Sequence, residues 1–529
     1  MRVRDHALWA DEEVTRALAR VLRFMSGDAE YLFSFTPGHD TPPERLFVGE
    51  QFAVPLDQPV SVSLFSGGLD SLAGAVELLD RTAAPVCLVS HRSQPGVTRT
   101  QDQLIAALRK QYPDRIIQYP FTCTLHGKRA LEESQRTRAF LYTSIAFALS
   151  AALSQDHLYL YENGFRALNP LLRQDAVNAR ASRTAHPQTV SLLEAFLSLV
   201  AERRFEIRTP FLWKTKADIM SQLSGSPASG LATSAVSCSR TRRKPRGTTH
   251  CGLCSQCVDR RIAVYAAGLD DRFDDVGTYA HDFITEGVAD SEVRGRLVDY
   301  IRQATEYRTW DIDAFWQSEF DEIAEVNGHI PGLGEQKTVE RLYDLCSRHA
   351  EQVFTALRRM RGVHDDLVSP YGPRSLLGLI TSREYAREPV EQLADRLHAK
   401  LSQALPMLYQ TEPPADEQRL NDALAALLDD GRGEWQREFP ILKFGLARAI
   451  PDHSLPTYDL LVEAKYIRQG TTPSRASEGL AADLTKYPEH QYKLFVVFDP
   501  YDKVADAQAF GRPFEARGNC RVCVVRRVR

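Results

Sequence analysis

The chain has 529 residues, a length that predicts three or four domains. Hydrophobic residues make up 43% and charged residues 25%, ordinary globular values that exclude a largely disordered or fibrous chain. The net charge of −4 provides no overall attraction to nucleic acid or anionic lipid, so such binding would need a local patch.

No segment predicts membrane insertion or export. The longest uncharged stretch, residues 139–155, includes polar residues and falls short of the ~20 apolar residues that span a bilayer. The first residues, MRVRDHALWADEEV, lack the apolar core of a secretory signal. Four of the nine cysteines crowd between Cys238 and Cys257, which indicates metal binding in a reducing compartment. We therefore expect a cytoplasmic protein with no membrane partner.

Four regions can be separated along the chain. Residues 1–57 combine a short helical pattern with a turn-rich stretch and are predicted to form an N-terminal extension. Residues 58–290 alternate strand-like and helix-like segments, which predicts an α/β fold with a doubly wound parallel sheet. Residues 291–405 have helical periodicity and predict a helical connector. Residues 406–529 return to a mixed pattern and predict a second α/β domain.

The individual elements follow from these patterns. In the second region we expect strands at 60–65, 85–90, 116–119 and 157–161, and helices at 71–79, 101–111 and 136–153. In the fourth region we expect a helix over 417–428 and strands near 439, 449, 461, 495 and 522.

The segment VSVSLFSGGLDS at residues 60–71 carries the first chemical motif. An apolar strand runs into two glycines, which permit a tight turn, and a helix follows. Backbone N–H groups and the helix N-terminus then form an anion site, which serine hydroxyls extend, while Asp70 supplies a carboxylate for Mg²⁺. No lysine lies in the loop, so it is not a Walker motif. The predicted ligands of the phosphates and Mg²⁺ are Ser66, Gly67, Gly68, Leu69, Asp70 and Ser71.

The string SGGLDS between a strand and a helix resembles the PP-loop of the N-type ATP pyrophosphatases. This resemblance implies cleavage of ATP between the α and β phosphates and adenylation of a second substrate. It implies catalytic roles for Asp70 and Ser71. An ordinary glycine-rich turn is the alternative interpretation of the segment.

Further side chains are placed to complete such a site. Basic residues open two later helices, and among them Arg138 and Lys216 are predicted to bind the pyrophosphate, because positive charge offsets the charge that builds up on the leaving group. Polar residues also follow two strands, at the end of a parallel sheet where ligands bind. Solvated charge and plain turns are the alternatives for the remaining candidates, which are Arg136, Lys214, Ser90, His91 and the segment Glu162-Asn163-Gly164.

Four cysteines form the second motif, Cys238-x12-Cys251-x2-Cys254-x2-Cys257. Two-residue spacings allow successive thiolates to bind one ion, and four sulfur ligands favour a closed, structural zinc site. An iron–sulfur cluster and simple core packing are the alternatives. The twelve-residue spacer is rich in arginine and lysine and is a candidate patch for nucleic acid or an acidic partner.

Together, SGGLDS and the later CGLCSQC resemble the QueC family of 7-cyano-7-deazaguanine synthases over roughly residues 58–290. The resemblance implies ATP, Mg²⁺ and structural Zn²⁺ as cofactors and a 7-deazaguanine carboxylate as the substrate. The segments RTRAFL, YENGFRALNP and SRTAHP are more similar to the QueC-like branch of anti-phage systems (QatC-like). That branch implies transfer of the activated acid to an amine, such as the N-terminus of a partner protein.

The C-terminal region carries a third motif, Pro451-Asp452-x10-Glu463-x-Lys465, across a predicted hairpin. Glu463 and Lys465 lie on one face of a strand, and Asp452 on the neighbouring strand can approach them. Asp452 and Glu463 are predicted to bind Mg²⁺, and Lys465 to orient or activate water. The arrangement resembles the PD-(D/E)XK nuclease fold, which implies a catalytic role for all three residues and nucleic acid as a partner. A salt-bridged hairpin is the alternative. Reserve carboxylates and nearby basic residues are Glu438, Asp459, Lys443, Arg448, Arg468, Arg475 and Lys486.

Other functions remain open on these motifs. A synthase that makes the nitrile with ammonia would turn over with ammonium alone. A tRNA-modifying PP-loop enzyme would release AMP only with tRNA present. A nucleic-acid-binding nuclease that merely senses ATP would bind the nucleotide without releasing pyrophosphate.

Overall fold

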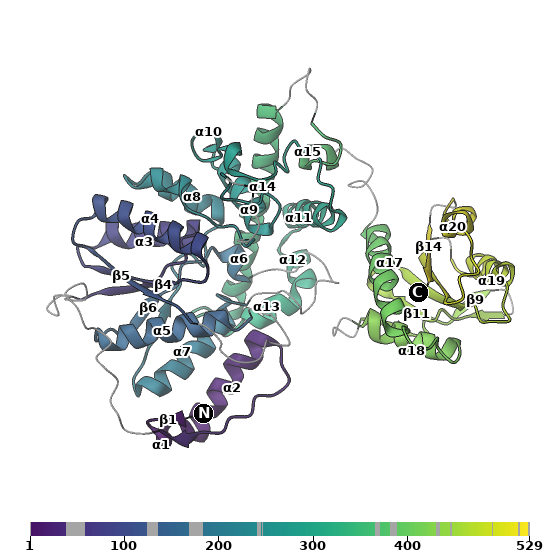
Figure 1. The fold of residues 1–529 in the computed structure, drawn as a ribbon, viewed down its shortest axis with the longest axis horizontal. Helices are drawn as coiled ribbons and strands as arrows, with labels where there is room; N and C mark the ends of the chain where they lie inside the picture. The colour runs from purple at the N-terminus through teal and green to yellow at the C-terminus, as the bar shows by residue number, and fades with distance from the viewer. Residues whose placement is uncertain are drawn as a thin grey trace. The chain divides into compact units, whose positions relative to one another are not determined.

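The computed structural model describes residues 2–38, 59–123, 136–168, 183–240, 245, 247–364, 371–380, 389–429, 434–444, 447–488, 490–516 and 519–526. The chain forms two compact units, Met1–Ser382 and Arg383–Arg529 (Figure 1). Each unit has its own sheet and its own core.

The first unit is built on a five-stranded sheet in which every described pairing is parallel. This confirms the α/β class and the parallel sheet expected from the alternating pattern. The strands, in sheet order, are β5 (Ile116–Phe121), β4 (Val86–His91), β3 (Ser61–Leu64), β6 (His157–Tyr159) and β7 (Glu206–Arg208).

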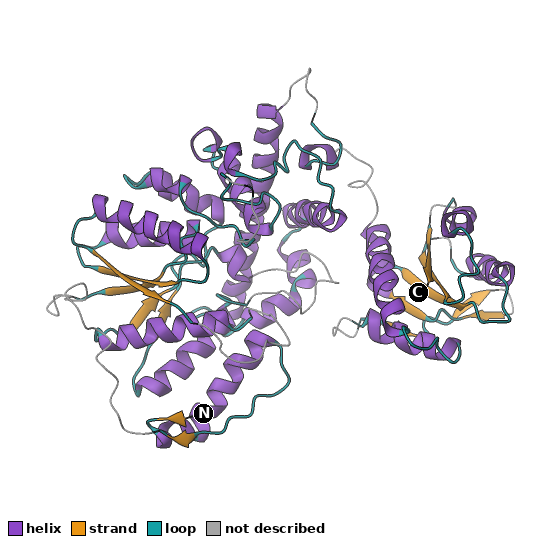
Figure 2. Ribbon diagram, viewed as in Figure 1, coloured by secondary structure: helices purple, strands orange, loops and turns teal. Residues whose placement is uncertain are grey.

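Alternate side chains of these strands enter two separate cores. In β4, Val86 and Leu88 pack in one cluster, whereas Cys87 and Val89 pack in the other. Such alternation is the period-2 pattern of a strand that is covered on both faces. Figure 2 shows helices on both sides of the sheet.

The helices of this unit divide between the two faces. Those on the first face include α3 (Leu69–Arg81), α4 (Pro95–Gln111), α8 (Lys216–Ser224) and α9 (Ser255–Ala266). Those on the second include α2 (Glu12–Ser26), α5 (Arg138–Ala152) and α7 (Pro187–Ala201). Shorter helices are α1 (His6–Ala10), α6 (Gly164–Leu168), α10 (Asp270–Phe273) and α15 (Leu376–Leu379), with 3₁₀ turns at Ser229–Thr233 and Val276–Thr278; short strands β1 (Arg2–Val3) and β2 (Thr36–Pro37) pair near the N-terminus.

The N-terminal residues belong to this unit rather than to a separate extension. Helix α2 begins after the N-cap Asp11 and ends at Gly27, and it buries Val14, Leu18 and Val21 in the second-face core. The predicted division at residue 57 therefore does not coincide with a boundary between compact units. The turn-rich residues 39–58 lie outside the described part of the chain.

A third layer of helices covers α6 and α9. It consists of α11 (Ser291–Thr309), α12 (Ile312–Ser318), α13 (Phe320–Val326) and the long α14 (Glu335–His364). Residues 291–364 form mostly helices, as their periodicity predicts, but these helices pack on α6 and α9 instead of forming an independent connector. Tyr307 and Leu345 are among the residues that this layer buries.

The second unit contains a mixed five-stranded sheet. Its strands, in sheet order, are β14 (Cys520–Arg526), β13 (Tyr492–Asp499), β12 (Leu460–Tyr466), β11 (His453–Leu455) and β8 (Gln436–Arg437). Strands β11 and β12 form the antiparallel hairpin expected around the turn, whereas β12, β13 and β14 are parallel. A separate hairpin joins β9 (Leu442–Phe444) to β10 (Ala447–Ala449).

Helices cover both faces of this sheet (Figure 2). One face packs against α17 (Pro389–Leu408) and α18 (Glu417–Leu428), and the other against α19 (Pro473–Lys486) and α20 (Ala507–Glu515). A stripe of leucines from Leu393 to Leu405 places α17 in this core, so the structural boundary between units lies at 382/383 and not at 405/406. Cys520 and Cys523 are buried on opposite faces of β14, as the packing interpretation expects.

Within the described residues, no helix combines the length and apolar character that crossing a bilayer requires.

Candidate functional site

The order of strands locates a crevice in the first unit. The chain passes from β3 outward to β4 and β5, then returns to place β6 on the other side of β3. In open parallel sheets, ligands bind where the strand order reverses, at the carboxyl ends of the strands. Here that position is occupied by Ser66–Ser71 after β3 and by Glu162-Asn163 after β6.

The loop after β3 has the geometry of an anion-binding turn. Gly67 has a φ of +83°, a conformation that side chains rarely adopt, and Gly68 is the N-cap of α3. The Ser66 and Ser71 hydroxyl oxygens lie 3.1 Å apart, and the Gly68 N–H donates to Ser66 Oγ at 3.2 Å. The predicted phosphate ligands are therefore gathered at the N-terminus of one helix, which favours negative charge.

Helix α4 supports this loop from one side. The buried Gln101 Nε2 donates to the carbonyl oxygens of Ser66 at 3.3 Å and His91 at 3.2 Å. A Cβ on Gly67 would lie 3.3 Å from the Gln101 side chain. Gln101 thus joins the ends of β3 and β4 and fixes the turn.

Asp70 lies in a buried ion pair with Lys216, the first residue of α8. The Lys216 Nζ lies 2.9 Å from Asp70 Oδ1 and 3.2 Å from Oδ2, and both side chains are only 8% exposed. Asn163 Nδ2 donates to Asp70 Oδ2 at 2.8 Å. The structure thus brings together three residues that the sequence analysis placed separately.

Two acidic groups share this region and titrate differently. Burial opposes ionisation of Asp70, but the Lys216 ammonium and hydrogen bonds from Glu162 and Asn163 lower the pKa of its carboxyl below the ordinary value. Burial and the negative charge of Asp70 raise the pKa of Glu162 to about 8. At neutral pH, Glu162 therefore holds a proton next to an ionised Asp70.

A third acidic group, Asp259 of α9, lies close enough to Lys216 for its charge to raise the pKa of that ammonium. Burial raises its pKa, while the charges of Arg166 and Lys216 act in the opposite direction. Tyr300 of α11 hydrogen-bonds to Asp259 and is buried, which raises the pKa of its phenol. Asp259 lies two residues after Cys257 and Tyr300 lies on a separate helix, and the sequence analysis did not select either residue.

Helix α14 positions α8 and hence Lys216. Thr215 is the N-cap of α8 and forms a capping box with Asp218. From α14, Gln352 Nε2 donates to Asp218 Oδ1 at 2.7 Å, and Arg348 Nη1 lies 2.5 Å from Asp218 Oδ2. Helix α14 therefore supports the Asp70–Lys216 ion pair through its contacts with α8, and the sequence of α14 does not reveal this role.

The other basic candidates form contacts with residues outside the glycine loop. Lys214 Nζ lies 3.2 Å from Glu77 Oε2, on the side of α3 that faces α8. Arg136 donates to the Ser26 carbonyl at the end of α2. Arg138 is exposed, and its Nε donates to Tyr142 OH at 2.8 Å. Lys216 contacts the loop through its ion pair with Asp70.

Tyr142 links Arg138 to the end of β4. Its hydroxyl lies 3.0 Å from His91 Nδ1, and the two rings pack 5.0 Å apart. Burial and the nearby Arg138 guanidinium lower the pKa of His91. His91 thus lies at the end of β4, as its position after a strand predicts, and Tyr142 connects Arg138 to it.

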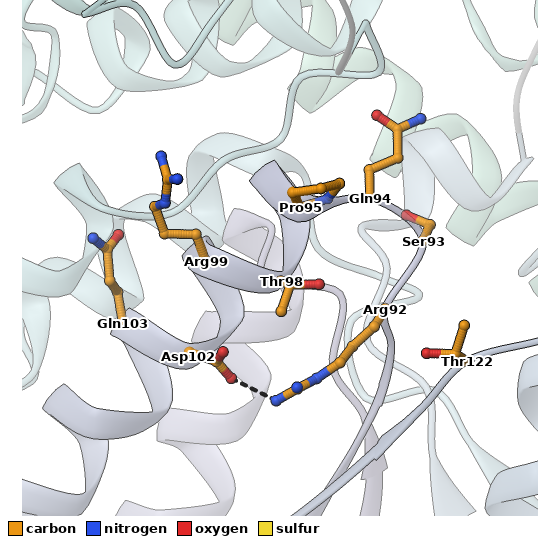
Figure 3. A pocket seen from close by; sticks show the side chains of 9 residues that line it. All are labelled: Arg92, Ser93, Gln94, Pro95, Thr98, Arg99, Asp102, Gln103 and Thr122. Atoms are coloured by element: carbon orange, nitrogen blue, oxygen red, sulfur yellow. Dashed lines mark hydrogen bonds and ion pairs between the residues drawn. The ribbon is translucent and has the colours of Figure 1, made fainter.

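A shallow hollow of about 660 Å³ lies beside the β4–α4 turn (Figure 3). At its base Arg92 Nη2 donates to Asp102 Oδ1 at 2.8 Å, and the side chains of Arg99 and Gln103 project from α4 above it. No residue of the Ser66–Ser71 loop lines this hollow.

The four cysteines converge as the spacing predicts. Their sulfur atoms all lie within 4.8 Å of one another, with Cys254 Sγ 3.4 Å from Cys257 Sγ and 4.0 Å from Cys238 Sγ. Tetrahedral Zn²⁺ with bonds of about 2.3 Å separates its sulfur ligands by roughly 3.8 Å, so the cluster fits zinc. Backbone N–H groups of Leu253 and Cys254 point to Cys251 Sγ, an arrangement that stabilises thiolates. Four of the five basic residues of the spacer, Arg242, Arg243, Lys244 and Arg246, lie outside the described residues.

Arg261 anchors the cysteine cluster to the segment that follows it. The guanidinium is fully buried, its Nη2 lies 2.7 Å from Asp274 Oδ2, and it also pairs with Asp282. We expect Arg261→Met to cost about 3–5 kcal/mol of unfolding free energy, because two buried carboxylates lose their partner. Urea unfolding of the full chain measures this loss, and an exposed control, Arg109→Met, should stay within about 0.5 kcal/mol of wild type.

The second unit brings its three predicted residues together at the β11–β12 hairpin. The Ala464 N–H donates to Asp452 Oδ2 at 2.8 Å, and Lys465 Nζ lies 2.9 Å from Glu463 Oε1. Leu460, Val462 and Ala464 face the opposite core, as the alternation requires. Burial raises the pKa of Asp452 and of Glu463, and for Glu463 the charge of Asp452 adds to the effect.

Helix α19 adds two residues that the sequence analysis missed. Asp483 Oδ2 lies 2.8 Å from Lys465 Nζ, and Tyr487 OH donates to Glu463 Oε2 at 2.7 Å. Burial opposes the charge of Lys465, but the two carboxylates outweigh it and raise its pKa. Asp483 lies in the last turn of α19 and Tyr487 is its C-cap, and their spacing of four residues was the available signal.

The reserve carboxylates do not join this group. Asp459 is an exposed residue of the turn before β12, and Glu438 is exposed after β8. Glu417, at the start of α18, is nearer, and burial together with the charge of Glu463 raises its pKa. Among the basic candidates, Lys486 lies 3.1 Å from Asp483, and Arg468 packs on Tyr466.

Comparison with known protein families supports the interpretation of the first unit. Residues 183–268 match the family model of the queuosine biosynthesis protein QueC. The match includes Lys216, Asp259 and all four cysteines, and it begins after the SGGLDS loop. The chain thus contains a QueC-like segment, which suggests an ATP-using synthase or ligase and a small-molecule substrate. No curated protein matches the chain.

Proposed function

We propose that the first unit activates a 7-deazaguanine carboxylate by adenylation, releasing pyrophosphate. The observation that carries the proposal is the buried Asp70–Lys216 pair at the glycine loop, because it connects the loop to the QueC-like segment. A carboxylate oxygen of the substrate forms a bond to the α-phosphorus of ATP. The bond from that phosphorus to the bridging oxygen breaks, and pyrophosphate leaves.

The residues of the loop have defined roles in this reaction. Ser66, Gly68 and Ser71 bind phosphate oxygens, and Asp70 would hold Mg²⁺, which would screen the phosphate charges. Lys216, the partner of Asp70, offsets the charge of the leaving pyrophosphate. Arg138 approaches the phosphates from the rim. Zinc on the four cysteines keeps the adjoining wall in place.

The acyl adenylate is consumed by an amine, with AMP as the second leaving group. The amine attacks the acyl carbon, its nitrogen loses a proton, and an amide forms. The resemblance to the anti-phage branch supports the N-terminus of a partner protein as the acceptor, in cytoplasmic defence. Ammonia, as in a nitrile synthase, and tRNA are the competing acceptors.

Pyrophosphate and AMP release tests this proposal. Purified protein is supplied with Mg-ATP and 7-carboxy-7-deazaguanine, and acceptors are added one at a time: ammonium, tRNA, and proteins encoded beside this gene. Release that depends on the acid supports activation, and the acceptor that accelerates it identifies the product. Absence of release with every combination would refute the proposal.

The second unit has a candidate function of its own, metal-dependent cleavage of nucleic acid. Two facing carboxylates whose pKa values are raised, beside a lysine, favour this function because a divalent cation relieves their repulsion. Asp452 and Glu463 hold Mg²⁺ in this proposal. Lys465 orients the attacking water or stabilises charge on the phosphate. The hairpin between helices resembles the PD-(D/E)XK arrangement.

Cation binding to this site should depend on pH. Protonation of Asp452 and Glu463 competes with the metal. Because the pKa values of both carboxyls are raised, the affinity for the metal should begin to decline at a higher pH than it would for ordinary carboxylates. Mn²⁺ affinity measured by paramagnetic resonance checks this dependence. Glu463→Gln should abolish the binding, whereas the exposed Asp459→Asn should not; equal binding by both variants would contradict the site.

A further inference from the structure

The segment 232–238 connects the cysteine cluster to the phosphate loop. The Val236 N–H donates to the Gly67 carbonyl at 3.0 Å. The Leu69 N–H donates to Ser237 Oγ at 3.2 Å. The next residue is Cys238, the first cysteine of the cluster. Two residues that contact the loop thus directly precede a metal ligand.

Ser237 is placed to bind an anion at this loop. Leu69 is the first residue of α3, so its N–H has no partner within the helix. Ser237 Oγ accepts that hydrogen bond, and the hydroxyl proton takes no part in it. A Cβ on Gly68 would lie 3.7 Å from Ser237 Oγ and 3.8 Å from the Val236 carbonyl, so the segment borders the face of the loop that receives phosphate.

Helix α9 also contacts the segment 232–238. Cys254 is the N-cap of α9, Cys257 lies in its first turn, and the buried Arg260 lies one turn further on. Arg260 Nη2 donates to the Ala232 carbonyl at 2.8 Å, and Nη1 to the Ala235 carbonyl at 3.2 Å. A metal that joins Cys238 to Cys254 and Cys257 therefore fixes both ends of the segment.

We propose that the cysteine cluster positions Ser237 as a phosphate ligand, so that zinc and ATP bind the first unit cooperatively. This inference rests on the proposed ATP-dependent function. Linkage is reciprocal: zinc strengthens nucleotide binding, and the nucleotide strengthens zinc binding by the same factor. Ser237 is a positioning residue for the Leu69 N–H and a donor to the phosphate.

Zinc release provides a test that does not require turnover. The zinc-loaded full chain is mixed with the chelating dye 4-(2-pyridylazo)resorcinol, with or without Mg²⁺ and α,β-methylene-ATP, an analogue that resists cleavage between the α and β phosphates. We expect the analogue to raise the zinc affinity, measured by equilibrium competition with the dye, at least about fivefold in wild type and in the exposed control Ser234→Ala. In Ser237→Ala the increase should fall below about twofold.

Affinity for the analogue, measured by calorimetry, provides the matched readout. Ser237→Ala should weaken it about five- to tenfold, and Ser237→Thr, which keeps the hydroxyl, should restore it. If wild type does not bind the analogue at all, the proposed function fails. If wild type binds it but has the same zinc affinity with and without it, the linkage is refuted; this comparison needs no variant and therefore holds even if Ser237→Ala unfolds.

Discussion

Replacing Asp70 with asparagine is expected to lower acid-dependent pyrophosphate release at least about a thousandfold. The substitution keeps the size of the side chain and its hydrogen bond with Asn163, but it removes the charge that holds Mg²⁺. It also leaves the buried Lys216 ammonium without its nearest counter-charge. We therefore expect a loss of about 3 kcal/mol in unfolding free energy as well.

Two further variants separate the chemical effect from the structural one. Asp80→Asn changes an exposed residue at the other end of α3 and should leave pyrophosphate release unchanged. The double variant Asp70→Asn with Lys216→Met should be more stable than the sum of the single losses predicts, since no unpaired charge remains. Wild-type release by Asp70→Asn would show that this carboxylate does not take part in the reaction.

Removing a cysteine ligand is expected to have the largest effect on the first unit's stability. A closed four-sulfur site contributes metal-binding energy directly to folding, about 10–16 kcal/mol in zinc-finger peptides. Cys254→Ser breaks this site at the start of α9, where Cys254 also lies against Cys238 and Cys257. We expect purified wild type to carry one zinc per chain, and Cys254→Ser to lose it and to melt at a lower temperature.

Metal analysis by mass spectrometry and thermal melting measure these two effects. Cys123→Ser is the control, because Cys123 is an exposed thiol outside the cluster. Iron with absorbance in the visible range would identify an iron–sulfur cluster instead of zinc. Wild-type zinc content in Cys254→Ser would show that the cluster is not the binding site.

The candidate site was only partly accessible from the sequence, and particular residues show why. The SGGLDS motif can be identified from the sequence because its glycines, serines and aspartate are adjacent. The cysteine motif can be identified from its spacing. Lys216 could be proposed as a helix-start cation, yet its partner Asp70 lies 146 residues away, and only the sheet order brings them together. Asp259 directly follows the cysteine motif and Tyr300 lies on a separate helix, but neither position reveals that the fold brings Asp259 close to Lys216 and Tyr300.

The fold shows the same division between local and long-range information. Alternation and helical periodicity predicted the parallel sheet and most of its helices. Helical periodicity also predicted an apolar stripe on α2, α14 and α17, but periodicity does not show which other elements pack against that stripe. The structure packs α2 and α14 in the first unit and α17 in the second, so the regions 1–57 and 291–405 do not stand as separate bodies.

Isotope transfer tests adenylation most directly. Purified protein is given Mg-ATP and 7-carboxy-7-deazaguanine labelled with ¹⁸O in its carboxylate, together with the acceptor that accelerates release, and the products are analysed by mass spectrometry. Adenylation predicts one ¹⁸O in AMP and none in pyrophosphate, because the carboxylate oxygen bonds to the α-phosphorus and stays there when the amine attacks. Unlabelled AMP, or ADP and phosphate as the products, would contradict it.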